Sequence, residues 1–352
     1  MAPMRVVGRY AKRAMSATRV SPAGLKIDSS DSCLEWRGAV SLERDAGAVK
    51  AWRIPFEERM LYHEGLRGRA ATAAGVRVAF GTDARTIGGS AVTGDEPAAI
   101  DLVIGDELIA TQPLDERGSF EFATMPEGEK VVELWLPQFG DFWLRGLKLN
   151  DGARIWRAED TRPKWITYGS SITHCRAAAS PALTWPAVAA RGRGLNLTCL
   201  GYGGNCHLDP LVARVIRDRP ADFLSMKVGI NIYGAGSLSP RTFAPGIIAF
   251  VQIVREEHAD TPLVVISPII SPPRETEPNR AGFTLSGMRD EVAGAVETLR
   301  AQGDRNVHYV DGLSLFGPDL VSLLPDNVHP NAEGYQALGN NFLREVAARY
   351  FV

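Results

Sequence analysis

The pattern of apolar residues changes near residue 160, and this change constrains the fold more than any other feature of the sequence. Up to about residue 156, short runs of alternating apolar and polar residues recur at roughly ten-residue intervals, with turn-forming residues between them. The clearest runs are GVRVAF (75–80), IDLVIG (100–105), GSFEFA (118–123), KVVELWLP (130–137) and FWLRGLKL (142–149). Alternation gives each strand one buried and one solvated face. We therefore predict an all-β sandwich over residues 1–155.

The second half alternates buried strands with helices. Apolar runs such as WITY, FLSMKVG and PLVVISPII are followed by stretches with helical spacing. In one of these, Met288, Val292, Val296 and Leu299 fall on one face, and Gly303 fits a C-cap. Strand–helix alternation predicts a parallel sheet with helices on both faces. We place this second domain at residues 160–352, after a polar, turn-rich segment.

Composition excludes several classes of partner and supports an intracellular protein. A net charge of −2 and a pI near 6.3 give no global attraction to nucleic acid or anionic membranes. No run of about 18 apolar residues is present, so we predict no membrane span. The four cysteines are too sparse for a disulfide scaffold, and we expect free thiols.

The first twenty residues are basic and contain no acidic residue, which faintly resembles a transit peptide. Met4 and Met15 offer a later start as a second explanation. They contain no apolar stretch long enough for a secretion signal. We expect a soluble, cytoplasmic protein.

Glycines and polar residues follow the predicted parallel strands directly. These segments are GSSIT (169–173), GYGGN (201–205) and GIN (229–231), and DNVHP (326–330) precedes the last predicted helix. Ligands bind at the carboxyl ends of the strands in an open α/β sheet. The segments are therefore expected to contribute to one site.

Together these segments contain every group that acyl transfer by serine requires. A serine after a tight glycine turn exposes its hydroxyl, and a histidine with a nearby carboxylate can remove the proton. Asp326 lies three residues before His329, so its carboxylate can reach the far ring nitrogen. Gly204 allows close approach of a backbone N–H, and Asn231 offers a side-chain N–H for an oxyanion.

Each segment alone has an ordinary structural explanation. Gly-Ser-Ser occurs in many loops, and a histidine before Pro330 is a common polar lead-in to a helix. It is the occurrence of all four, in chain order and at strand ends, that favours catalysis.

These four blocks resemble those of the SGNH (GDSL-type) hydrolases, over about residues 163 to 352. The resemblance implies a flavodoxin-like three-layer fold. It also implies that Ser171 is the nucleophile, with Asp326 and His329 completing the triad. Ser171, Gly204 and Asn231 would supply the oxyanion donors.

Two positions depart from the family pattern, which usually has aspartate where this chain has Ser170 and Ile232. They indicate a divergent subgroup. The β-rich first half resembles a jelly-roll or carbohydrate-module-like sandwich that would cover the pocket. This order of domains is similar to that of the salicylyl acyltransferases of tetracycline-type polyketide biosynthesis, and secreted carbohydrate esterases share it broadly.

The sequence offers little support for other kinds of site. His174, Cys175, Cys206 and His207 lack the spacing of a zinc site, so we predict no metal. GYGG would need a further glycine at Cys206 to form a dinucleotide loop. His174 and His207 are candidates for the pocket wall, while His63, His258 and His308 belong to no motif. The aromatic residues Trp135, Phe139, Phe142 and Trp143 are candidates for a ligand surface, although at least half are expected in the core.

We therefore predict an acyltransferase that moves an arylacyl group from a thioester, such as acyl-CoA, to a hydroxyl of a bulky small molecule. An ester hydrolase and a non-catalytic binding protein are the alternatives. The predicted enzyme needs no cofactor or metal and has no nucleic-acid or membrane partner; its oligomeric state is left open. Residues 160–352 alone are expected to fold but to lose activity on the natural substrate.

Overall fold

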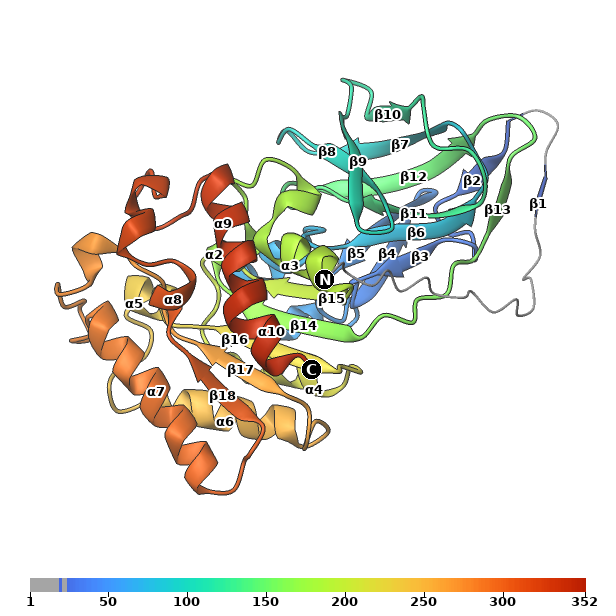
Figure 1. Cartoon of the computed structure of the whole chain (residues 1–352). Helices are drawn as coiled ribbons and strands as arrows, with labels where there is room; N and C mark the ends of the chain where they lie inside the picture. The colour runs from blue at the N-terminus through green and yellow to red at the C-terminus, as the bar shows by residue number, and fades with distance from the viewer. Residues whose placement is uncertain (1–18, 21–23) are drawn as a thin grey trace, which may run out of the picture.

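The computed structural model describes residues 19–20 and 24–352, and it divides into an antiparallel and a parallel half (Figure 1). The transit-like basic segment at the start lies outside the described residues, apart from its last two positions. Among the described helices, none is long and apolar enough to cross a membrane.

The first half is a sandwich of two antiparallel sheets. In one sheet the strand order is β1-β13-β6-β11-β8-β9, with β3 on β6; in the other it is β10-β7-β12-β5-β4, with β2 on β12. This confirms the predicted antiparallel sandwich. The first sheet contains β1 (Arg19–Val20), β3 (Glu35–Arg37), β6 (Arg77–Thr82), β8 (Ala99–Ile104), β9 (Glu107–Pro113), β11 (Lys130–Trp135) and β13 (Arg154–Trp156). The second contains β2 (Lys26–Asp28), β4 (Ser41–Asp45), β5 (Ala48–Trp52), β7 (Ile87–Thr93), β10 (Ser119–Phe122) and β12 (Phe142–Leu149).

Strand β12 shows how the apolar pattern builds the core of the sandwich. Its register against β7 shifts between Leu144 and Gly146, which inserts one residue into the alternation. Because of this bulge, the inward residues are Phe142, Leu144, Leu147 and Leu149, all buried. Strand β13 was missed by the sequence analysis, since its three residues lie in the segment predicted as a polar connection.

The second half is a five-stranded parallel sheet of order β15-β14-β16-β17-β18. Its strands are β14 (Lys164–Gly169), β15 (Asn196–Gly201), β16 (Phe223–Lys227), β17 (Leu263–Ile266) and β18 (Val307–Val310). The chain order reverses direction across the sheet between β14 and β16, which is where such sheets bind ligands.

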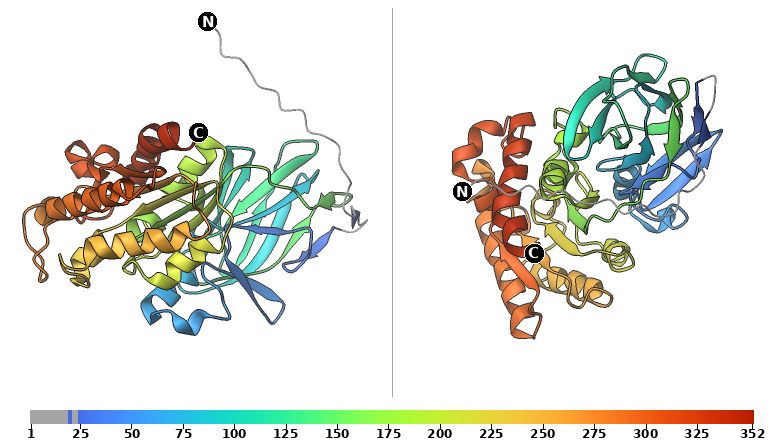
Figure 2. Two further views of the ribbon diagram at one scale, coloured as in Figure 1. Left: turned by 90° about the horizontal axis from the view of Figure 1, so that it is seen from below. Right: turned by 45° about the vertical axis from the view of Figure 1, so that its right-hand side comes forward.

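Helices cover both faces of this sheet, as predicted (Figure 2). Helices α4, α6 and α7 pack on one face, and α3 and α9 on the other. The helices are α1 (Glu64–Ala70), α2 (Ser171–His174), α3 (Trp185–Arg193), α4 (Pro210–Arg217), α5 (Ile230–Ala235), α6 (Phe243–Arg255), α7 (Leu285–Ala301), α8 (Gly312–Leu315), α9 (Ala332–Phe342) and α10 (Ala348–Tyr350). Shorter turns are η1 (Arg59–Leu61), η2 (Pro181–Leu183), η3 (Pro272–Arg274), η4 (Pro318–Leu323) and the π-type η5 (Leu343–Ala347).

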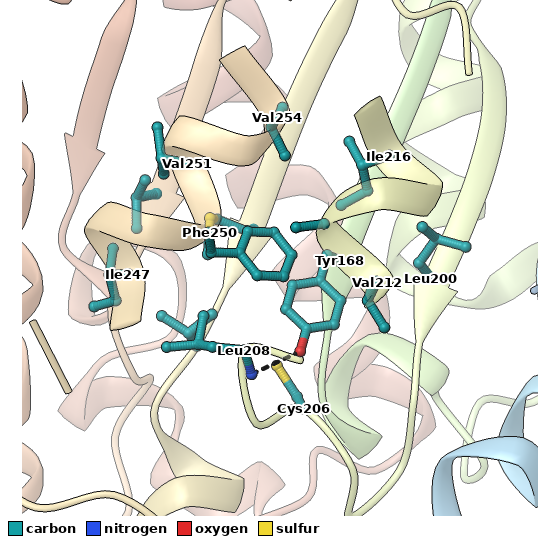
Figure 3. Packing of buried hydrophobic residues seen from close by; sticks show 14 of the residues in the cluster. Tyr168, Leu200, Cys206, Leu208, Val212, Ile216, Ile247, Phe250, Val251 and Val254 are labelled. Atoms are coloured by element: carbon teal, nitrogen blue, oxygen red, sulfur yellow. Dashed lines mark hydrogen bonds between the residues drawn. The ribbon is translucent and has the colours of Figure 1, made fainter. Parts of the chain in front are cut away.

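Tyr168 shows how the strand before the candidate nucleophile is fixed. Its ring lies between residues of α4 and α6 (Figure 3) and stacks on Phe250 at 5.0 Å between centroids. Its hydroxyl accepts a hydrogen bond from the Leu208 backbone N–H at 3.1 Å. The buried hydroxyl is therefore satisfied, and it ties β14 to the loop after β15.

Strand β15 is the edge of the parallel sheet, and arginines of the sandwich bind its free carbonyl groups. Arg77 donates to the Leu197 carbonyl at 2.5 Å. Arg53 donates to the Cys199 and Gly201 carbonyls at 3.1 and 2.6 Å. Side chains thus replace the strand that would otherwise pair with this edge.

Arg53 is completely buried, and burial lowers the pKa of its guanidinium below the usual range. Its remaining N–H groups donate to the Thr72 carbonyl, the Thr72 hydroxyl and the Arg69 carbonyl. With the two bonds to β15, all five guanidinium N–H donors have acceptors. A buried cation without a carboxylate is thereby stabilised by dipoles, and by the Tyr202 ring, whose centre lies 5.2 Å from the guanidinium carbon.

The apolar cores of the two halves are also continuous. Trp52, Ile54 and Leu66 of the first half pack in the same cluster as α4 and α6, and Trp135 packs with α3 and α9. Residues 160–352 alone would expose this surface together with the β15 carbonyls. Independent folding of that segment, expected from the sequence, would have to tolerate this exposure.

We predict that Arg53→Met lowers the free energy of unfolding by about 3–5 kcal/mol, because it leaves several buried acceptors without donors. Arg145→Met is the matched control, since Arg145 is exposed on β12, and its effect should stay within about 0.5 kcal/mol. Denaturant titrations of both variants measure the difference. Equal free energies of unfolding for the two variants would show that the edge strand β15 does not depend on Arg53.

Candidate active site

Ser171 is the first residue of α2 and lies at the carboxyl end of β14. Ser170, just before it, has an extended backbone, and its hydroxyl accepts a hydrogen bond from the Ile172 N–H at 3.3 Å. This buried serine therefore caps the helix at the position where the family usually has aspartate. The other departure, Ile232, is completely buried in the core.

The structure brings Ser171, His329 and Asp326 together. The Ser171 Oγ is 2.8 Å from His329 Nε2, and His329 Nδ1 is 2.6 Å from Asp326 Oδ2. The other carboxylate oxygen of Asp326 accepts from the backbone N–H groups of Val328 and His329 at 3.0 and 2.7 Å. The turn is closed by Asn327, whose φ is +62°.

The electrostatics of this turn keep the carboxylate charged. Burial alone would raise the pKa of Asp326, but hydrogen bonds from the His329 ring and from the two backbone N–H groups lower it to about 2. Asp326 is therefore ionised at neutral pH and fixes the proton of His329 on Nδ1. The free lone pair on Nε2 then faces the Ser171 hydroxyl, as a general base requires.

The loop after β15 lies between Ser171 and Asn231. A Cβ on Gly203 would be 3.5 Å from the Ser171 Cβ, so this backbone runs directly beside the serine. Gly204 follows with φ +74°, a conformation that glycine adopts without strain. Further along, the Cys206 N–H donates to Asn231 Oδ1 at 3.1 Å.

Three N–H donors in this region remain available. Since Asn231 Oδ1 accepts from Cys206, its Nδ2 is free to donate. Within the described part of the chain, neither this Nδ2 nor the backbone N–H groups of Ser171 and Gly204 have a hydrogen-bond acceptor. Free donors beside a serine nucleophile are what an oxyanion hole requires.

His207 supports this loop and does not simply line a pocket. Its Nε2 is 3.0 Å from the Gly204 carbonyl and its Nδ1 is 2.8 Å from the Ser237 hydroxyl. The imidazole therefore holds the turn at Gly204 against the loop after α5. The sequence signal for this role was only the proximity of His207 to the glycines.

His174 is a structural link between the two halves. It is buried, and its Nε2 is 2.8 Å from the Gln138 carbonyl and 3.0 Å from the Thr72 hydroxyl. Its Nδ1 accepts from the Gly203 N–H at 3.4 Å. Burial lowers the pKa of this imidazole well below 6.5, and Arg53 lowers it further. His174 is thus a neutral contact behind the serine helix.

The aromatic residues and cysteines singled out in the sequence differ in how deeply they are buried. Trp135 and Phe142 are buried in the core, whereas Phe139 and Trp143 are half-buried. The four cysteines are buried, and none of them forms a disulfide within the described residues. Across the described residues, no group of three or more His, Cys, Asp or Glu side chains is arranged to hold a metal ion.

Helix α1 was missed by the sequence analysis, which predicted only strands in the first half. His63 caps it by accepting from the Gly65 N–H at 3.2 Å, and the helix lies against the loop after β15. A Cβ on Gly65 would be 2.6 Å from Asn205 Oδ1, so this contact requires glycine. The residues of α1, EGLRGRA, do not alternate between apolar and polar. This lack of alternation was the signal in the sequence that argued against a strand here.

A parallel sheet of this order, with serine, histidine and aspartate at its carboxyl edge, defines the class of serine-dependent acyltransferases and esterases. Comparisons with known proteins agree. The family model described as GDSL-like lipase/acylhydrolase matches residues 167–337, and the model of the SsfX3 N-terminal domain matches residues 34–145. A search of curated proteins found no match.

Solved structures give the family more specifically. The salicylyl-acyltransferase SsfX3 from a tetracycline biosynthetic pathway is 37% identical over 93% of this chain and 98% of its own, with a TM-score of 0.87. A GDSL-like lipase from Bacteroides ovatus is 21% identical over 90% of this chain and 95% of its own, with a TM-score of 0.74. A family two carbohydrate esterase from Clostridium thermocellum, in complex with cellohexaose, is 13% identical over 90% and 98%, with a TM-score of 0.65. The last two show the fold alone.

The chain therefore belongs to the SGNH (GDSL-like lipase/acylhydrolase) family, with an SsfX3-type N-terminal domain. This confirms the resemblance, the fold class and the prediction of an enzyme. The alternative of a non-catalytic binding protein is set aside.

We predict that Asp326→Asn lowers kcat by about 10³–10⁴, because the amide no longer fixes the proton on His329 Nδ1. The exposed Asp319→Asn is the control and should keep wild-type rates. Hydrolysis of 4-nitrophenyl acetate measures both variants. A small loss in Asp326→Asn would remove Asp326 from the triad.

We predict that Asn231→Ala lowers kcat by about 10²–10³, the usual cost of losing one oxyanion donor. Asn231→Asp is the matched variant: it keeps the acceptor for the Cys206 N–H but replaces the Nδ2 donor with an oxygen. An equal or larger loss in Asn231→Asp attributes the effect to the donor. Wild-type rates in that variant would instead point to a purely structural role.

Proposed function

We propose that this enzyme transfers an acyl group from a thioester, such as an acyl-CoA, to a hydroxyl of a bulky small molecule, through an acyl-enzyme on Ser171. The observation that carries the proposal is the 37% identity, over 93% of the chain, with a salicylyl-acyltransferase of a tetracycline biosynthetic pathway. An arylacyl donor and a polycyclic hydroxylated acceptor are therefore the first substrates to test.

In the first half-reaction, His329 Nε2 takes the proton of the Ser171 hydroxyl as Oγ attacks the thioester carbonyl. The Asp326 carboxylate stabilises the imidazolium that forms. The N–H groups of Ser171 and Gly204 and the Asn231 amide bind the oxyanion. When the carbon–sulfur bond breaks, His329 returns the proton to the leaving thiolate, and the acyl-enzyme remains.

The second half-reaction repeats these steps with the acceptor. The acceptor hydroxyl gives its proton to His329 Nε2 and attacks the acyl-enzyme carbonyl. Collapse of the second tetrahedral intermediate breaks the ester bond to Ser171, which regains the proton from His329. Free enzyme and a new ester are the products.

Hydrolysis is the alternative outcome of the same site. The side chains of His329 and Asp326 are 40% and 54% exposed, so water reaches the catalytic residues. Transfer then requires a bound acceptor that excludes water from the acyl-enzyme. The acylhydrolase name of the matching family supports an esterase as the second candidate.

Other properties follow as part of the proposal. The chemistry uses only side chains and backbone N–H groups, so we expect it to need neither metal nor cofactor. We also expect a cytoplasmic enzyme whose partners are small molecules, because thioester donors are made inside the cell.

The deciding experiment incubates the purified enzyme with an aryl-CoA, with and without a polycyclic hydroxylated acceptor. We expect a new acyl ester, detected by mass spectrometry, only when both are present, and none with Ser171→Ala. Equal release of CoA without acceptor, and no ester product, would establish an esterase.

A further inference from the structure

A surface cavity of about 630 Å³, largely open to solvent, lies between α1 of the sandwich half and the loop that carries Gly204. We name it the α1 cavity. Its volume is in the range of small-molecule sites. It is lined by Trp52, His63, Glu64, Gly65, Arg67, Gly68, Arg69, Ala71 and Asn205.

The cavity is connected to the catalytic loop by direct contacts. Asn205 follows Gly204 and donates through Nδ2 to the Gly203 carbonyl at 2.8 Å. Its carboxamide packs on Gly65 of α1, as described above. A ligand in the α1 cavity therefore lies next to the loop that holds the proposed oxyanion donors.

Two arginines give the cavity its charge. Within the described chain, neither Arg67 nor Arg69 has a carboxylate partner, and the nearest polar contact of the Arg67 guanidinium is the Met60 sulfur at 3.3 Å. Glu64 is the only acidic residue of the lining. Arg255, which is half-buried as these two arginines are, forms an ion pair with Asp304 instead.

Arg69 is also held in place by its surroundings. Its backbone carbonyl accepts from Arg53 at 2.5 Å, and its guanidinium carbon lies 5.1 Å from the centre of the Phe139 ring. That ring lies 5.5 Å from the ring of His174, which is on the serine helix. Arg176 also lies over the Phe139 ring, but it is paired with Glu96. Arg69 is thus an ordered, unpaired cation near the site.

We propose that the α1 cavity binds an anionic group of the substrate, a carboxylate or a phosphate, through Arg67 and Arg69. This assignment rests on the proposed serine-dependent acyl transfer. Guanidinium groups bind both anions through paired N–H donors, and an arginine already ordered loses little entropy on binding. The α1 cavity would then make the enzyme selective for charged substrates.

The test compares paired substrates, one of which carries the anionic group while the other lacks it. 4-Acetoxybenzoate against 4-acetoxybenzamide probes a carboxylate, and an acyl-CoA against the acyl-pantetheine with the same acyl group probes the phosphates. We expect wild-type kcat/KM to favour the anionic member of at least one pair, and the pair that responds identifies the anion. The double variant Arg67→Gln/Arg69→Gln should reduce that preference about tenfold or more, as expected for charge-assisted hydrogen bonds.

Arg117→Gln is the matched control, because Arg117 is an exposed arginine on the sandwich away from this helix. It should leave the preference unchanged. Loss of the preference in Arg117→Gln, no preference in either pair, or a preference retained in the double variant would overturn the proposal.

A binding measurement separates this proposal from the proposed function. Titration of Ser171→Ala protein with CoA or 4-hydroxybenzoate, against pantetheine or 4-hydroxybenzamide, needs no turnover. If the α1 cavity binds anions, the charged probe of one pair binds more tightly, and adding the two arginine substitutions removes the difference. Equal binding of both members in both pairs would refute the anion site even in an active enzyme.

Discussion

The five hydrogen bonds of the Arg53 guanidinium hold the two halves of the molecule in one arrangement. Strand β15 ends the parallel sheet, and its outward carbonyls at Cys199 and Gly201 need donors that no sixth strand supplies. Arg53 reaches them from the sandwich and also binds the Thr72 and Arg69 carbonyls. An arginine that is buried without a counter-ion is stable only while all of these acceptors keep their places.

This constraint also sets the position of the catalytic loop. The Gly201 carbonyl that Arg53 binds ends β15, and the loop with Gly203 and Gly204 begins directly after it. The Arg69 carbonyl that Arg53 binds belongs to α1. One side chain therefore fixes the helix and the loop on either side of the α1 cavity. The sandwich thereby helps to position the loop that carries Gly203 and Gly204.

The exposure of the triad to solvent explains why the triad alone does not decide between hydrolysis and acyl transfer. His329 and Asp326 lie on a short turn ahead of α9, and both side chains are substantially exposed. The site offers the same base to water and to an alcohol, so the outcome depends on which of them occupies the space beside the acyl-enzyme.

The sequence by itself determined the fold class and brought the candidate site into view. Periods of two and of 3.6 residues report which faces are buried, and the carboxyl ends of parallel strands meet at one edge, so Ser171 and Asn231 were expected at the same edge. Only the tertiary structure decided the roles of Arg53, His174 and helix α1. Their partners are distant in the chain, and a buried arginine or histidine carries no local pattern that names the carbonyl it will bind. Such contacts depend on how two separately patterned halves pack, which local spacing does not encode.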